Sequence, residues 1–159
     1  MTYSLAIADD HLLIAKALTG IIENFRNYHV LYEVEHGKAL MEKMAMPKNI
    51  PDIVLLDISM PVMDGFATAQ WLKENHPEIL ILTLSMQDDE QTLIRMIKAG
   101  ASGYLLKNAH PLELENALDS LVTKGFYYPD WATSKVLFNI ASGNDMKNSV
   151  PKLNEREKE

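Results

Sequence analysis

The chain has 159 residues, of which 47% are apolar, and its 22 acidic against 15 basic side chains give a formal net charge of −7. This length suits one domain with a short appendage and excludes two full domains. Because a surface with this surplus of negative charge repels nucleic-acid phosphates, and no basic patch offsets it, these residues are not expected to bind DNA or RNA.

Cysteine is absent, which excludes disulfides and thiolate metal sites within this sequence. The longest apolar runs, Ile53–Leu56 and Ile79–Leu82, are far shorter than the roughly 20 residues that span a bilayer. The N-terminal residues reach paired carboxylates at once and do not have the pattern of a secretory signal. We therefore expect a cytoplasmic protein without a membrane segment.

Strand-like apolar runs alternate with segments of helical periodicity along the chain. The expected strands are Leu5–Ala8, Val30–Val34, Ile53–Leu56, Ile79–Leu84 and Gly103–Leu106. The expected helices are Ile14–Phe25, Gly37–Met46, Asp64–Asn75, Asp88–Ala99 and Leu112–Val122. Unbroken apolar runs are typical of strands covered by helices on both faces, so the pattern predicts an α/β fold with a doubly wound, five-stranded parallel sheet. The second run is half polar, which favours an edge position.

Chemically active side chains stand where the expected strands end. They are Asp9 and Asp10, Asp57, Ser85, and Lys107. In a doubly wound sheet these ends share one edge, where ligands bind. Two unit charges about 4 Å apart interact by roughly 4 kcal/mol at an effective dielectric near 20, so three clustered carboxylates need cations. Lys107 supplies one positive charge and Mg²⁺, with its oxygen ligands, would supply the rest.

A phosphoryl group is the expected ligand at this edge of the sheet, because the metal, the Lys107 amine and the Ser85 hydroxyl can each bind one of its oxygens. Asp57 projects from a stiff loop that contains Pro61, and Asp64 opens the next helix. A carboxylate can attack phosphorus and form an acyl phosphate. We expect Asp57 to accept the phosphoryl group while Asp10 helps to hold the metal.

The residues around this set form four segments, which are Asp9-Asp10, Leu55–Gly65, Leu84-Ser85 and Gly103–Lys107. Together they resemble the receiver domain of bacterial two-component response regulators, over about residues 4 to 123. The resemblance implies a flavodoxin-like sheet with the strand order 2-1-3-4-5.

The resemblance also implies roles for individual residues. Asp57 matches the phosphoacceptor, which takes phosphate from a phosphohistidine of a sensor histidine kinase. Asp9, Asp10, Asp57 and the backbone carbonyl of Ser59 match the Mg²⁺ site, with Asp9 acting through water. The family's chemistry is self-catalysed phosphotransfer and autodephosphorylation, so we expect no conventional enzyme activity.

Lys107 matches the catalytic lysine, and with Ser85 it matches the pair that binds the phosphoryl oxygens. In this family the hydroxyl moves towards the phosphate and an aromatic side chain, here Tyr104, turns inward behind it. Ser85 and Tyr104 are therefore the expected switch. The surface that this switch alters in the family corresponds here to residues 88–122. We expect phosphorylation to promote a homodimer through this surface.

Three further segments resemble the LuxR/NarL (FixJ) type of transcriptional regulator, in which a receiver precedes a helix-turn-helix output domain. They are Asp9-Asp10-His11, Leu84–Glu90 and Lys107-Asn108-Ala109. We expect residues 1–123 to form the receiver and residues 124–152 an aromatic turn, a helix over Trp131–Ala141 and a linker. Residues 153–159 are expected to begin a missing DNA-binding domain, through which alone the protein would contact DNA.

The sequence departs from many receivers at two positions. Asn108 follows Lys107 where proline with a cis bond is usual, which leaves the isomer of this bond open. Met86 is bulkier than the usual residue beside the hydroxyl, so we hypothesise that it restricts the approach of water to the acyl phosphate. The five histidines, His11, His29, His36, His76 and His110, lack metal-ligand spacing and are interpreted as structural or surface groups.

Simpler interpretations remain for single residues. Asp9 and Asp10 can cap a helix, Ser85 can form a turn, and Tyr104 can be a half-buried strand aromatic. At the level of function, the alternatives are a Mg²⁺-dependent phosphohydrolase with an aspartyl-phosphate intermediate and a receiver-like module that no longer takes phosphate.

Overall fold

The computed structural model describes residues 2–86 and 88–132, and its centre is a parallel sheet of five strands. The strands are β1 (Tyr3–Ala8), β2 (Tyr28–Val34), β3 (Ile53–Asp57), β4 (Leu80–Ser85) and β5 (Gly103–Leu106). Their order, β2-β1-β3-β4-β5, confirms the expected doubly wound sheet and places the half-polar β2 at an edge.

The helices fall in the predicted gaps between the strands and after the last one. They are α1 (Leu12–Glu23), α2 (Gly37–Met44), α3 (Gly65–Asn75), α4 (Glu90–Ala99) and α5 (Pro111–Lys124), with a 3-10 turn η1 (Pro47–Asn49). Strand β1 begins two residues earlier than the apolar run, because Tyr3 and Ser4 pair with Tyr28 and His29 of β2.

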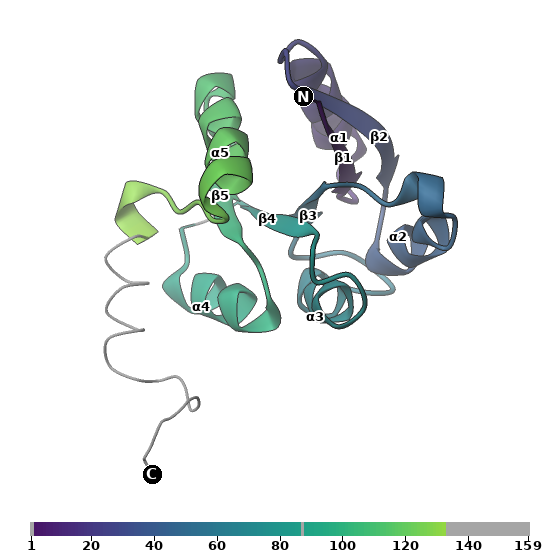
Figure 1. Ribbon diagram of the computed structural model, residues 1–159. Helices are drawn as coiled ribbons and strands as arrows, with labels where there is room; N and C mark the ends of the chain where they lie inside the picture. The colour runs from purple at the N-terminus through teal and green to yellow at the C-terminus, as the bar shows by residue number, and fades with distance from the viewer. Residues whose placement is uncertain (1, 87, 133–159) are drawn as a thin grey trace. The chain divides into compact units, whose positions relative to one another are not determined.

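The helices form two layers that bury opposite faces of the sheet. Helices α1 and α5 cover one face, and α2, α3 and α4 cover the other (Figure 1). Successive residues of β1 divide between the layers: Leu5 and Ile7 pack with α1 and α5, whereas Ala6 and Ala8 pack against α2 and α3 residues. Side chains alternate across a strand, so both faces of β1 must be apolar.

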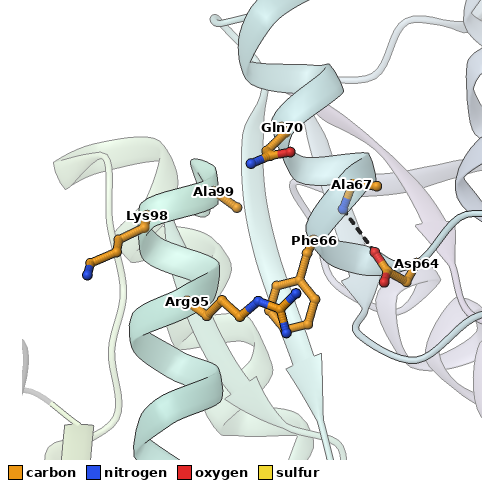
Figure 2. A pocket seen from close by; sticks show the side chains of 7 residues that line it. All are labelled: Asp64, Phe66, Ala67, Gln70, Arg95, Lys98 and Ala99. Carbon is orange, nitrogen blue, oxygen red and sulfur yellow. Dashed lines mark hydrogen bonds between the residues drawn. The ribbon is translucent and has the colours of Figure 1, made fainter.

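Helices α3 and α4 pack side by side around a cavity of about 340 Å³ (Figure 2). The guanidinium carbon of Arg95, on α4, lies 3.8 Å from the centre of the Phe66 ring, on α3. A cation over an aromatic face is attracted by the ring quadrupole. This contact ties α4 to the helix that follows Asp57.

The segment after α5 contacts the sheet through Tyr127, whose backbone forms a bridge with Gly103 of β5. A Cβ on Gly103 would lie only 2.7 Å from the Tyr127 carbonyl oxygen, so the close approach depends on glycine. The chain divides into two units, residues 1–127 and 128–159. Of the helix predicted over Trp131–Ala141, only Trp131 and Ala132 are described; the expected linker and residues 153–159 lie outside the described residues.

Over the described part of the chain, none of the helices has the length and apolar character that crossing a membrane requires.

Candidate functional site

The strand order creates a crevice at the carboxyl ends of β1 and β3. The chain leaves β1 for β2 on one side and returns to β3 on the other, and ligands of doubly wound sheets bind where the order reverses in this way. Asp9 and Asp10 follow β1, and Asp57 is the last residue of β3. The topology therefore brings together the three carboxylates that the sequence separates.

Lys107 joins this group from the end of β5. Its Nζ lies 3.0 Å from Asp9 Oδ2 and 3.1 Å from Asp57 Oδ1, and its side chain is only 2% exposed. One buried ammonium is thus shared by two buried carboxylates. Asp10 lies at the rim of the group, with 33% of its side chain exposed.

The two oxygens of Asp57 have different surroundings. Oδ1 accepts a hydrogen bond from the Ile58 amide at 2.8 Å and contacts Lys107, whereas the buried Oδ2 has no hydrogen-bond partner among the described residues. Burial raises the pKa of Asp57 from 3.8 to about 6; the hydrogen bond with Lys107 opposes this rise and the charge of Asp9 adds to it. The site therefore holds an incompletely satisfied carboxylate.

The loop between β3 and α3 fixes the direction of Asp57. A Cβ on Gly65 would lie 2.4 Å from the Asp57 carbonyl oxygen, so only glycine permits the start of α3 to approach this closely. The Gly65 amide donates to the Ile58 carbonyl at 2.8 Å. Val62 has φ of +67°, which is strained for a β-branched residue, and the adjacent Met63 amide donates to the Pro61 carbonyl at 2.6 Å.

Beside Asp57 opens a cleft of about 250 Å³, whose lining includes the predicted residues Ser59 and Ser85 together with Met86. Ser85 is buried, whereas Met86 is 68% exposed at the cleft. The structure thus places Ser85 and the Asp57 carboxylate on one cleft. Its volume lies below the roughly 300–1,000 Å³ that is typical of pockets for drug-sized ligands, so it suits a small group better than a large organic substrate.

Tyr104 lies behind Ser85 and is completely buried, rather than the half-buried strand aromatic that was the simpler interpretation. Burial raises the pKa of the Tyr104 hydroxyl, and a hydrogen bond with the Ser85 side chain opposes that rise. The side chain of Tyr104, on β5, therefore points into the core and is hydrogen-bonded to Ser85. Ser85 also accepts, through its carbonyl, a 2.7 Å hydrogen bond from the Lys107 amide.

The sequence analysis did not place His11 at this site, because it interpreted the histidine as a structural or surface group. The His11 Nδ1 atom lies 3.0 Å from Asp9 Oδ1, 3.5 Å from Asp10 Oδ1 and 3.8 Å from Asp57 Oδ2. The available signal was its position directly after the two aspartates. Spacing rules for metal-binding histidines overlook a ligand set assembled from two strand ends.

The sequence does not decide whether the bond between Lys107 and Asn108 is cis or trans, and the structure defines this isomer. All peptide bonds of the described residues are trans, including the bond between Lys107 and Asn108.

The donor atoms of this site fit a cation. One potential ligand atom each from Asp9, Asp10, His11 and Asp57 lies within 4.8 Å of the others. Asp57 Oδ2 lacks a hydrogen-bond partner among the described residues, and the one ammonium of Lys107 does not neutralise three carboxylates. Oxygen donors of this kind are those that hard divalent ions prefer. These residues could therefore hold a metal ion.

The family follows from a match over most of the chain. Residues 5–119 match the response regulator receiver domain, so the chain belongs to this family. The strand order and the packed helices agree with that fold.

The curated relatives include regulatory proteins. The chain is 32% identical over 123 residues to the transcriptional regulatory protein DegU of Brevibacillus brevis, covering 77% of this chain and 51% of that protein. It is 33% identical over 136 residues to the oxygen regulatory protein NreC of Staphylococcus epidermidis, covering 85% of this chain and 61% of that protein. The chain thus spans about half to three fifths of the length of these relatives.

Solved structures of receiver domains superpose on this chain. The isolated receiver domain of RcsB from Salmonella enterica serovar Typhimurium, determined with the phosphomimetic BeF₃⁻, superposes with a TM-score of 0.75 at 25% identity, covering 84% of this chain and 98% of that chain. The receiver domain of the putative response regulator NarL from Mycobacterium tuberculosis superposes with a TM-score of 0.70 at 26% identity, covering 77% and 98%.

Proposed function

We propose that this chain is a phosphorylation-controlled regulatory module in which Asp57 accepts a phosphoryl group from a phosphohistidine of a sensor histidine kinase. In this transfer the histidine N–P bond breaks as an O–P bond forms to Asp57. The observation that carries the proposal is the buried Asp57 carboxylate, whose Oδ2 has no hydrogen-bond partner among the described residues, beside a cleft lined by Ser85. That oxygen is the one available to attack phosphorus.

Lys107 and Ser85 would stabilise the charge that arrives with the phosphoryl group. The Lys107 ammonium already lies 3.1 Å from Asp57 Oδ1, so a small movement would let it pair with a phosphoryl oxygen. The Ser85 hydroxyl, on the same cleft, would donate to another oxygen. Fixed donors placed where charge accumulates are the main contribution a protein makes to phosphoryl transfer.

Mg²⁺ is the proposed cofactor for this transfer. Asp9, Asp10, Asp57 and the backbone carbonyl of Ser59 would hold it, with Asp9 acting through a water molecule. When bound, the ion neutralises negative charge on the transferring group and on the carboxylates. Without it, three carboxylates and a phosphoryl group would share the single nearby ammonium of Lys107.

We infer that Ser85 and Tyr104 form the switch that reports phosphorylation. Their side chains share a hydrogen bond, so a movement of Ser85 towards the phosphoryl group would change the support of Tyr104. The affected face would comprise α4, β5 and α5, within residues 88–122. The stacking of Arg95 on Phe66 would couple α4 to the loop that holds Asp57 (Figure 2).

The proposed output is control of transcription through an attached DNA-binding domain. This step rests on the relatives named above, which are regulators longer than the chain. It also agrees with the receiver's surplus of acidic side chains, which makes direct DNA binding by these residues unfavourable. We propose a homodimer, promoted by phosphorylation through residues 88–122, as the active form.

Intact-mass spectrometry after incubation with Mg²⁺ and acetyl phosphate tests the proposed chemistry. A single added phosphate that is lost in Asp57→Asn supports a phosphoacceptor. Catalytic turnover of ordinary phosphate esters would instead support a phosphohydrolase. Absence of any added phosphate would support a receiver-like module that no longer takes phosphate.

A further inference from the structure

The cleft beside Asp57 has a second wall that the proposed function does not use. Besides Asp57 and Ser85, its lining includes Asp89 and Thr92, which lie at the start of α4. Asp57 is only 4% exposed, whereas Asp89 is an exposed residue. Asp89 therefore stands towards the mouth of the cleft, through which a phosphodonor must enter.

The Asp89 carboxylate is held in place by the helix that it caps. One oxygen, Oδ1, accepts a hydrogen bond from the Gln91 amide at 3.2 Å. The other, Oδ2, accepts one from the hydroxyl of Thr92, which lines the same cleft. Because both oxygens are bonded to the first turn of α4, the carboxylate cannot turn away from the cleft without losing the cap.

Capping does not account for the charge of Asp89. Asparagine and serine cap helices about as well as aspartate does, because a neutral side-chain oxygen also accepts the exposed amide. The favourable interaction of a negative charge with a helix start is already provided by Glu90, in the first turn of α4. None of the ion pairs among the described residues involves Asp89, so its charge is not neutralised there.

The charge of Asp89 faces the part of the cleft where a leaving group would stand. In-line phosphoryl transfer places the leaving group on the side of phosphorus opposite the attacking oxygen. With Asp57 as the attacking group, that side faces the mouth of the cleft. Phosphohistidine releases an imidazole, which is neutral or, when protonated, cationic, whereas acetyl phosphate releases an acetate anion. A fixed negative charge at the mouth opposes the departure of the anion only.

We propose that Asp89 determines which phosphodonors this chain accepts, because its charge disfavours donors whose leaving group is an anion over donors whose leaving group is a nitrogen base. The inference rests on the proposed function, since it concerns the leaving group in the transfer to Asp57. Both kinds of donor transfer the same phosphoryl group, so effects on that group cancel in the ratio of their rates. Asp89 is thus a residue of donor specificity and takes no part in bond formation.

Two small donors isolate this effect, because neither needs a protein surface for delivery. Acetyl phosphate reacts as its O–P bond breaks and acetate leaves. Phosphoramidate, whose nitrogen is already protonated, reacts as its N–P bond breaks and neutral ammonia leaves. In each case a new O–P bond forms to Asp57, and the electron pair of the broken bond stays with the leaving group.

Asp89→Asn removes the charge and keeps the cap, since an amide oxygen accepts from the Gln91 amide as the carboxylate does. With Mg²⁺ and at low ionic strength, we expect acetyl phosphate to label the full-length variant about threefold faster than the parent, and phosphoramidate to label it no faster. In about 1 M KCl, where the screening length falls to about 3 Å, this difference should disappear. Glu42→Gln is the matched control: it removes an exposed charge from α2, outside the lining of this cleft, and should leave the ratio of the two rates unchanged.

The ratio of the two rates separates an effect of charge from an effect of structure. A displaced α4 or a misplaced Asp57 would change labelling by both donors equally, whereas loss of the Asp89 charge changes the ratio. Labelling of Asp89→Asn with the parent's ratio would overturn this inference and leave the proposed function standing. Absence of labelling of the parent by both donors would contradict the proposed function, and the inference with it.

Discussion

The buried Asp57 carboxylate should make stability depend on pH. Burial raises its pKa in the folded chain to about 6, against 3.8 for the ordinary side chain. The folded state then binds the proton more tightly, so ionisation of Asp57 lowers the free energy of unfolding as the pH rises from about 4 to beyond 6. The carboxylate that we propose as the phosphoacceptor is thereby also a source of instability.

Asp57→Asn removes this titration. We predict that, without divalent ions, the variant gains stability relative to the parent by about 1 kcal/mol between pH 5 and pH 7. Urea unfolding at several pH values measures the difference. Mg²⁺ should reduce this difference in stability, because the ion binds the ionised parent more tightly than it binds Asp57→Asn. A difference that stays constant across this range would contradict the assigned environment of Asp57.

Two buried threonines form a matched pair for testing hydrogen bonding in the core. Thr83, on β4, and Thr68, on α3, are both fully buried. The Thr83 hydroxyl has no hydrogen-bond partner among the described residues, whereas the Thr68 hydroxyl donates to the Asp64 carbonyl at 2.6 Å. A hydrogen bond therefore offsets the cost of burying the Thr68 hydroxyl, whereas none offsets the cost of burying the Thr83 hydroxyl among the described residues.

We predict that Thr83→Val leaves the free energy of unfolding unchanged or raises it by up to about 1 kcal/mol, because it removes an unsatisfied polar group. Thr68→Val should lower it by about 1 kcal/mol. Chemical denaturation of both variants makes the comparison. A larger loss in Thr83→Val than in Thr68→Val would show that the Thr83 hydroxyl has a partner of its own.

The start of α3 is positioned by a close approach to the end of β3, where Asp57 lies. A Cβ at Gly65 would lie 2.4 Å from the Asp57 carbonyl oxygen and 2.8 Å from Ile58 Cα. Backbone atoms cannot move aside as a flexible side chain can. We predict that Gly65→Ala lowers the free energy of unfolding by at least about 2 kcal/mol and slows phosphorylation by acetyl phosphate.

Gly20 provides the control within another helix. It lies inside α1, and a Cβ there meets nothing within 4 Å. Gly20→Ala should therefore stabilise the chain by about 0.5 to 1 kcal/mol, because alanine is the better helix former. Thermal unfolding and the rates of labelling by acetyl phosphate are compared for Gly65→Ala and Gly20→Ala. Equal stability of Gly65→Ala and the parent would mean that α3 does not fix Asp57.

The elements were largely predictable from the sequence because their apolar patterns are local. The unbroken apolar run of β3 and the half-polar pattern of β2 gave a central and an edge strand, as observed. Element ends were less accurate: α4 begins at Glu90 instead of Asp88, because Asp89 caps it by accepting from the Gln91 amide. Capping geometry depends on the backbone and is only suggested by residue type.

The carboxylates and Lys107 were predictable as a group because parallel strands end at one edge. The contacts of His11 were not, since they depend on where its side chain turns. Similarly, neither the sharing of Lys107 between Asp9 and Asp57 nor the complete burial of Tyr104 is encoded in a local pattern. Such features arise from packing between strands that are distant in the sequence.

Exposed apolar side chains surround the carboxyl edge of the sheet. This apolar rim consists of Leu12, Leu13, Val62, Met86 and Leu112. They follow β1, β3, β4 and β5, so they lie on the same edge as Asp57. Exposed apolar side chains gathered at one edge of a fold are typical of a site that binds a protein partner.

We predict that Leu13→Asp, at a side chain that is 86% exposed, slows phosphotransfer from a phosphorylated histidine-kinase domain by about tenfold. Labelling by acetyl phosphate should not change, because this small donor needs no protein surface. Met46→Asp is the control, since Met46 is 51% exposed and follows the end of α2, away from the rim. Equal slowing by both variants would contradict the prediction that a protein partner binds the apolar rim.

Identification of the phosphorylated residue is the sharpest test of the proposed phosphotransfer to Asp57. After incubation with acetyl phosphate and Mg²⁺, borohydride reduction converts a phosphorylated aspartate to homoserine, and peptide mass spectrometry then identifies the residue. We predict homoserine at position 57 alone, and none after chelation of the metal. Homoserine at position 9 or 10, or its absence from position 57 in a phosphorylated chain, would contradict this prediction.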